Sequence, residues 1–117
     1  MNLLTVGYIE YQWGLNMFVA IYHYMMPPEK TKDYIMLEKK AIQIYKEHGC
    51  LEVEIYRNAK DPRWWMEVNR FKDREHYNEV VMAIDNDPRM APLFVKFLAL
   101  FNEKENKPEK NLYYQIL

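Results

Sequence analysis

Residues 50–71, with the sequence CLEVEIYRNAKDPRWWMEVNRF, decide the fold. Residues 50–57 alternate strictly between two sets of side chains, which is the period of a β-strand with one buried face. Residues 58–62, NAKDP, are turn-forming types, and residues 64–71, WWMEVNRF, combine the aromatic and β-branched types that favour strands. We therefore predict a β-hairpin of two antiparallel strands, 50–57 and 64–71.

The segment before the hairpin predicts a strand followed by a helix. Residues 18–25, FVAIYHYM, are rich in strand-forming side chains, and the two prolines that follow cannot donate to a ladder. Between residues 29 and 48, apolar side chains recur at steps of three and four, which indicates a helix with one buried face. Gly49 then suits a left-handed helix cap, so the helix should end there.

The segment after the hairpin predicts a broken helix pair and a last strand. Asp73 is a suitable N-cap for the first helix, and the sequence DNDP at residues 85–88 interrupts it. Residues 90–101 form a second helical run. We expect a polar loop over residues 102–110 and a short strand over residues 112–117.

The predicted order of strand, helix, strand, strand, helix, strand is the βαββαβ pattern of ferredoxin-like α+β folds. Right-handed crossovers place the helices on one face of an antiparallel sheet and leave the other face bare. That face is too apolar to remain in water, so we expect a second copy of the chain to cover it. We assign residues 17–117 to a single domain, and we interpret residues 1–16 as an N-terminal extension or an extra strand at a sheet edge.

Four segments resemble the dimeric α+β barrel superfamily, which includes antibiotic-biosynthesis monooxygenases, EthD-like proteins and uncharacterised members. They are FVAIYHY (18–24), KEHGCLEVEIYR (46–57), WWMEVNRFKDREHYNEV (64–80) and DPRMAPLFVKFLALF (87–101). The resemblance implies a dimer of ferredoxin-like domains. It does not imply one reaction, because the superfamily contains cofactor-free oxygenases, haem-degrading enzymes, lyases and proteins of no known activity. We carry over no catalytic residue from it.

Composition narrows the classes of function. The 117 residues include 16 basic and 17 acidic side chains, and this balance gives no broad attraction to nucleic acid or anionic lipid. The single cysteine, Cys50, cannot form an internal disulfide, and no run of about 18 apolar residues suggests a membrane span. Motifs for nucleotide binding, serine hydrolysis, zinc proteolysis and dithiol redox chemistry are lacking. We expect a cytoplasmic protein without a cofactor or metal.

The candidate catalytic residues are His23, Glu54 and Glu67. His23 lies in the first strand, and a histidine with a near-neutral pKa suits proton transfer. We expect Glu52, Glu54 and Glu67 to lie on one side of the hairpin, where like-charge repulsion between facing carboxylates would raise a pKa and create a base. The alternatives are that His23 is a core histidine and that the glutamates are ordinary polar-face residues paired with basic side chains.

Aromatic side chains could line a ligand pocket between the sheet and the helices. The candidates are Tyr22, Tyr24, Tyr45, Trp64, Trp65 and Phe94. An apolar pocket with a few hydroxyl groups suits a flat aromatic or acyl ligand. The alternative is that the same residues fill an ordinary core.

Two functional hypotheses follow. The first is a homodimer, or a higher oligomer, that binds a small apolar or aromatic ligand and has a cofactor-free monooxygenase-like or isomerase-like activity. The second is a non-catalytic structural or interaction dimer, for which a filled core would be the sign. Metal or haem binding would require His23 to converge with Glu54 or Glu67.

Overall fold

A computed structural model of the chain describes residues 17–101 and 108–117. The elements occur in the predicted βαββαβ order, with the second crossover split into two helices. They are β1 (Phe18–Met25), the short 3-10 helix η1 (Pro28–Lys30), α2 (Thr31–Glu47), β2 (Glu52–Arg57), β3 (Trp64–Phe71), α3 (Arg74–Asp85), α4 (Met90–Leu98) and β4 (Glu109–Tyr114). The extension or strand predicted at residues 1–16 lies outside the described residues.

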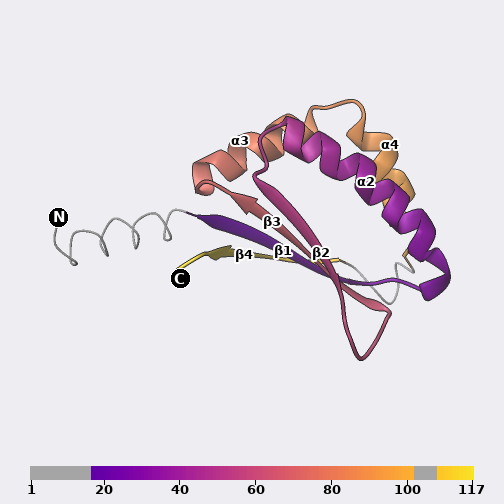
Figure 1. Ribbon diagram of the computed structural model, residues 1–117. Helices are drawn as coiled ribbons and strands as arrows, with labels where there is room; N and C mark the ends of the chain where they lie inside the picture. The colour runs from indigo at the N-terminus through magenta and orange to yellow at the C-terminus, as the bar shows by residue number, and fades with distance from the viewer. Residues whose placement is uncertain (1–16, 102–107) are drawn as a thin grey trace.

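The four strands form one antiparallel sheet in the order β2-β3-β1-β4. This is the strand order that right-handed crossovers produce in a ferredoxin-like fold. Figure 1 shows α2, α3 and α4 together in one layer over a single face of the sheet. The predicted fold class is therefore confirmed, and the sheet has an inner face toward the helices and an outer face.

The hairpin register corrects one expectation about the glutamates. Arg57 pairs with Trp65, so Glu54 is opposite Val68 and Ile55 is opposite Glu67. Because side chains alternate between the two faces, Glu54 lies on the outer face and Glu67 on the inner one. The prediction that Glu54 and Glu67 share a face is wrong. A shift of one residue in the strand register moves every side chain of one strand to the other face of the sheet relative to the neighbouring strand.

The helix ends follow local chemistry that the sequence predicts. The side chain of Asp73 accepts a hydrogen bond from the backbone N–H of His76 at 2.7 Å, which caps α3. Gly49 has a φ of 105°. Glycine adopts this conformation at little cost because it has no Cβ atom. The last strand begins at Glu109, three residues earlier than expected, because polar side chains are tolerated in an edge strand.

Two groups of buried residues pack between the inner face and the helices. One contains Phe18, Ala20, Cys50, Phe71, Tyr77 and Val80, and the other contains Tyr24, Met26, Tyr34, Trp65 and Phe101. Tyr22 packs against both groups. The cavity described below draws lining residues from each of them.

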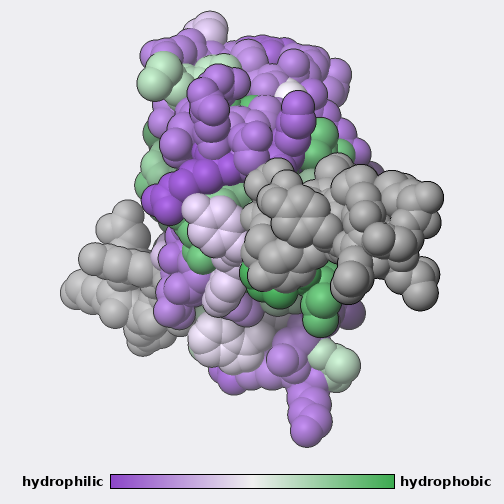
Figure 2. Space-filling model, turned by 90° about the vertical axis from the view of Figure 1, so that its left-hand side faces the viewer, coloured by the Kyte–Doolittle hydropathy of each residue, from purple (hydrophilic) through white to green (hydrophobic). Residues whose placement is uncertain are grey.

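The surfaces of the two layers differ in polarity. Hydrophilic side chains predominate on the outside of the helical layer at the end of the molecule shown in Figure 2. The outer face of the sheet, in contrast, exposes large rings, with Trp64 at 41% and Tyr56 at 48% exposure. Within the described part of the chain, no helix is both long enough and apolar enough to cross a membrane.

Candidate functional site

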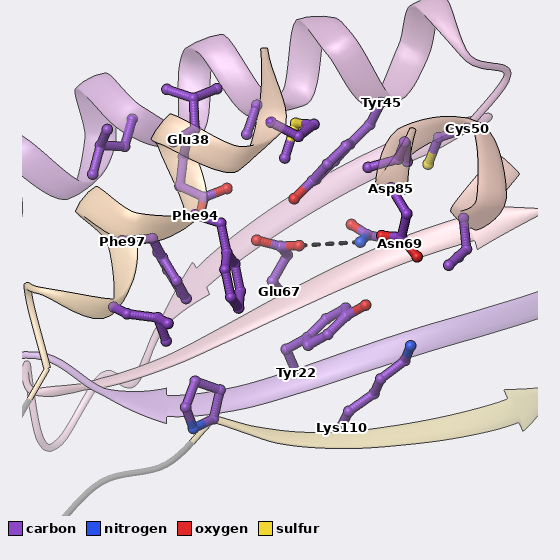
Figure 3. Close-up of a pocket in the computed structure, with 18 of the residues that line it drawn as sticks. Tyr22, Glu38, Tyr45, Cys50, Glu67, Asn69, Asp85, Phe94, Phe97 and Lys110 are labelled. Carbon is purple, nitrogen blue, oxygen red and sulfur yellow. Dashed lines mark hydrogen bonds between the residues drawn. The ribbon is translucent and has the colours of Figure 1, made fainter. Parts of the chain in front are cut away.

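A cavity of about 660 Å³ lies between the inner face of the sheet and the three helices. Its floor includes Tyr22, Glu67 and Asn69 from the central strands, and α2 contributes Glu38 and Tyr45 from above. Aromatic and aliphatic side chains of α4 form an apolar wall, in which Figure 3 shows Phe94 and Phe97. Such a volume suits a small organic molecule of two or three rings.

Two carboxyl groups meet in this apolar surrounding. Glu38 lies four residues after Tyr34 and three before Ala41, so it belongs to the buried face of α2. Glu67 points inward from β3, on the same face as Trp65. Glu38 is 7% exposed and Glu67 is 6% exposed, and their carboxyl groups lie close enough together to share a proton. A hydrogen bond between two carboxyl groups requires a proton on one of them.

Burial perturbs the protonation of this pair. Desolvation, followed by the charge of Glu67 and the hydrogen bond with it, raises the pKa of Glu38 to about 10. Burial also raises the pKa of Glu67, while hydrogen bonds from Glu38 and from the Asn69 amide at 3.0 Å act in the opposite direction. The pair therefore retains a proton at neutral pH. Glu67 accepts both hydrogen bonds, so it is the member that is stabilised as a carboxylate.

Two further polar atoms beside the pair have no hydrogen-bond partner within the described residues. They are Oε2 of Glu38 and Oδ1 of Asn69, and both side chains are more than nine-tenths buried. A buried polar atom left unpaired costs about 1–3 kcal/mol. A bound molecule that supplied hydrogen-bond donors would remove this cost, which favours the cavity as a ligand site.

The tyrosines around the cavity act as neutral hydroxyl groups. Burial is the largest cause that raises the pKa values of Tyr22, Tyr24 and Tyr45 above their usual range, and nearby carboxylates add to it. The hydroxyl of Tyr24 is hydrogen-bonded to that of Tyr34 on α2. These phenols can hold or orient a ligand, but they are poor bases near neutral pH.

The structure brings only some of the predicted site residues together. Tyr22, Tyr24, Tyr45, Phe94 and Glu67 line the cavity. Trp65 lies inward but is packed against Tyr34, with the ring centroids 4.9 Å apart, and is not part of the lining. Trp64 lies on the outer face of the sheet.

His23 and Glu54 also lie on the outer face. His23 is exposed and pairs with Met66 across β1 and β3. Glu54 accepts a hydrogen bond from Arg70 at 2.8 Å and another from the hydroxyl of Tyr56. The sheet itself separates these two residues from the cavity, so His23, Glu54 and Glu67 do not form one site.

Among the charged and amide side chains that line the cavity, sequence reasoning named only Glu67 and missed Glu38, Asn69, Asp85 and Lys110. The helical period places Glu38 on the same face as Tyr34 and Ala41, and this was the available signal for a buried carboxyl group. Lys110 was assigned to a loop, and its position follows only from the pairing of β4 with β1. Within the described ranges, no three His, Cys, Asp or Glu side chains come together as a metal site.

A ferredoxin-like domain with a ligand-sized cavity under its helices is the architecture of a subunit of the α+β barrel proteins. The family model for antibiotic biosynthesis monooxygenases matches residues 17–81. The chain belongs to this family, whose members are dimeric α+β barrels. A search of curated proteins found no sequence match.

Solved structures share the fold at low sequence identity. A conserved protein from Methanosarcina mazei Go1 is 16% identical, with a TM-score of 0.72, over 90% of this chain and 98% of that one. SnoaB, a cofactor-independent oxygenase from Streptomyces nogalater, is 8% identical, with a TM-score of 0.66, over 84% and 91%. A NIPSNAP family protein of unknown function from Agrobacterium tumefaciens is 20% identical, with a TM-score of 0.68, over 85% and 87%.

Proposed function

We propose that the protein binds a small, flat, largely apolar molecule in the cavity and that Glu67 removes a proton from it. The observation that carries this proposal is the buried Glu38–Glu67 pair in a cavity whose lining is mostly apolar. A carboxylate with a raised pKa is a stronger base than one in water, and its action in a dry site needs little solvent reorganisation. Glu38 holds the carboxylate in place through the shared proton.

The reaction that fits best is a cofactor-independent oxygenation. When an electron-rich aromatic ligand loses a proton, the resulting carbanion or phenolate can transfer electrons to O₂ directly. For a methylene group between two aryl rings, one O₂ oxidises the CH₂ to a C=O and the second oxygen atom leaves as water. Membership of the monooxygenase family and the shared fold of SnoaB support this choice. The same base could instead return the proton at another carbon, which would be an isomerisation.

The test uses anthrone, a three-ring ketone with an acidic methylene group between its aryl rings. We expect the wild-type protein to consume one O₂ for each anthraquinone formed. Glu67→Gln should lower kcat by about 10²- to 10⁴-fold, the usual contribution of a general base. Glu79→Gln, on the exposed side of α3, is the matched control and should leave the rate unchanged.

The outcomes separate the alternatives. Loss of a methylene deuterium label to solvent without O₂ uptake would favour isomerase-like proton transfer. Binding of anthrone with neither reaction would favour the non-catalytic dimer. Full activity of Glu67→Gln would remove Glu67 from the chemistry.

We also infer that the chain forms a homodimer through the outer face of its sheet and works in the cytoplasm. The exposed rings of Trp64 and Tyr56 on that face support the first inference, because a second copy would remove them from water. The second rests on the lone thiol of Cys50, which is buried and free. Such a thiol is compatible with a reducing compartment.

A further inference from the structure

Lys110 is the only basic side chain among the cavity-lining residues of the described chain. It lies on β4, and its backbone pairs with Tyr22 of β1, which in turn pairs with Glu67 of β3. These three side chains therefore form one row across the inner face of the sheet. Figure 3 shows Glu67, Tyr22 and Lys110 on neighbouring strands in this order.

Two tyrosine rings position the ammonium group of Lys110. Its Nζ lies 5.6 Å from the ring centroid of Tyr22 and 5.0 Å from that of Tyr77. Asp85 of α3 also lines the cavity, yet within the described residues no carboxylate lies within ion-pair distance of Lys110. The amine is thus held by ring contacts at the rim of the cavity, and no carboxylate of the described residues competes with a ligand oxygen atom for it.

The spacing of the row sets the span between the two polar groups. Adjacent strands are separated by about 4.8 Å, so Glu67 and Lys110 are roughly 10 Å apart at the level of the backbone. A flat ring system lying over Tyr22 could direct an acidic C–H or O–H toward Glu67 and an oxygen on its opposite side toward Lys110. A hydrogen bond of about 3 Å to Glu67, another of about 3 Å to Lys110 and the width of one ring between them together fill this span.

We propose that Lys110 is a catalytic residue, because it binds the ligand oxygen on which negative charge develops when Glu67 takes the proton. In this step the C–H bond breaks, the proton moves to Oε of Glu67, and the bonding electrons delocalise through the ring to give an enolate oxygen beside Lys110. This inference rests on the proposed function of Glu67.

The placement of the cation favours reaction over simple binding. Before proton transfer the ligand is neutral and the negative charge is on Glu67, whereas afterwards the charge is on the oxygen next to Lys110. An interaction that forms mainly in the transition state raises kcat more than it lowers KM. Because Lys110 is exposed at the rim, we expect an effect of about tenfold rather than the larger effect of a buried cation.

The experiment compares Lys110→Met, Lys110→Arg and the control Lys96→Met, which removes an exposed lysine of α4 outside the cavity. With anthrone, Lys110→Met should lower kcat about tenfold and change KM less than threefold, and Lys110→Arg should restore most of the rate. Equal kcat values for wild type and Lys110→Met would overturn the proposal, and so would equal losses in all three variants.

A binding measurement keeps the role of Lys110 testable without turnover. N-phenyl-1-naphthylamine and 8-anilino-1-naphthalenesulfonate share one aromatic body, and only the second carries an anion. Lys110→Met should weaken the sulfonate about fivefold, or about 1 kcal/mol, and leave the neutral dye within twofold. Equal changes for both dyes would show that Lys110 only packs against its neighbours, and would overturn the proposal.

The two proposals fail in different ways. If wild-type protein does not react with anthrone but Lys110→Met still weakens only the sulfonate dye, the proposed oxygenation is wrong and Lys110 remains a binding residue for an anionic ligand. Leu93→Trp, which places a large ring in the cavity wall, should weaken both dyes. If it changes neither, the dyes do not occupy the cavity, and both the ligand site and the role of Lys110 are wrong.

Discussion

The pH dependence of stability should reveal the proton that the Glu38–Glu67 pair retains. The pKa of Glu38 is raised from 4.5 to about 10 in the folded chain. Between these two values the folded state holds one more proton than the unfolded state, so the free energy of unfolding decreases as pH rises. One proton corresponds to about 1.4 kcal/mol for each pH unit, or roughly 2.7 kcal/mol between pH 6 and pH 8.

Glu38→Gln is the perturbation that isolates this effect. The amide keeps the size of the side chain and can still donate to Glu67, but it has no proton to lose. We expect the wild-type free energy of unfolding to fall more steeply with pH than that of Glu38→Gln, by about 1.4 kcal/mol per unit, because the amide still donates to Glu67 and keeps it ionised as in the wild type. The difference is large against a total stability of about 5–15 kcal/mol.

Urea denaturation followed by circular dichroism, at fixed protein concentration and at four pH values from 5.5 to 8.5, measures these slopes. Glu79→Gln, an exposed residue of α3, should behave as the wild type does. Parallel pH profiles for the wild type and Glu38→Gln would refute the reasoning, since they would mean that Glu38 ionises as readily in the folded chain as in the unfolded one.

Three further predictions concern residues outside the cavity lining. Hydrogen bonds from Arg89 and then His48 hold the pKa of Asp87 below its usual value, so Asp87→Asn should lower Tm at pH 7, with the difference shrinking as pH falls below about 4. Gly49→Ala should cost about 1–2 kcal/mol in urea denaturation, because φ is 105° there; an unchanged midpoint would contradict this. Trp64→Glu should shift the proposed dimer toward monomer in sedimentation velocity, and a dimer that persists would place the interface elsewhere.

The elements of the fold could be predicted because local signals were strong. The bounds of β1 and β3 agree with the expected ranges 18–25 and 64–71, since strand-forming side chains were flanked by prolines and turn residues. Asp73 and Gly49 mark helix ends through side-chain chemistry that a sequence displays directly. Such features depend on neighbours within a few residues.

The site depended on relations that the sequence does not display. Whether Glu54 and Glu67 lie on the same face of the sheet changes with a register shift of one residue, and only the backbone pairing of the two strands determines that register. The contact between Glu38 and Glu67 joins residues 29 positions apart, on α2 and β3, through the packing of the helix on the sheet. Lys110 enters the cavity because β4 starts earlier than its charged sequence suggested.

Infrared spectroscopy on protein with ¹³C-labelled glutamate carboxyl groups tests the central claim most directly. In the difference spectrum of wild type minus Glu38→Gln at pH 7.5, we expect the band of a protonated carboxyl group, and we expect this band to shift when N-phenyl-1-naphthylamine fills the cavity. A spectrum that contains only ionised carboxylates, or a protonated band that the dye leaves unchanged, would contradict a proton-sharing pair in a ligand-binding cavity.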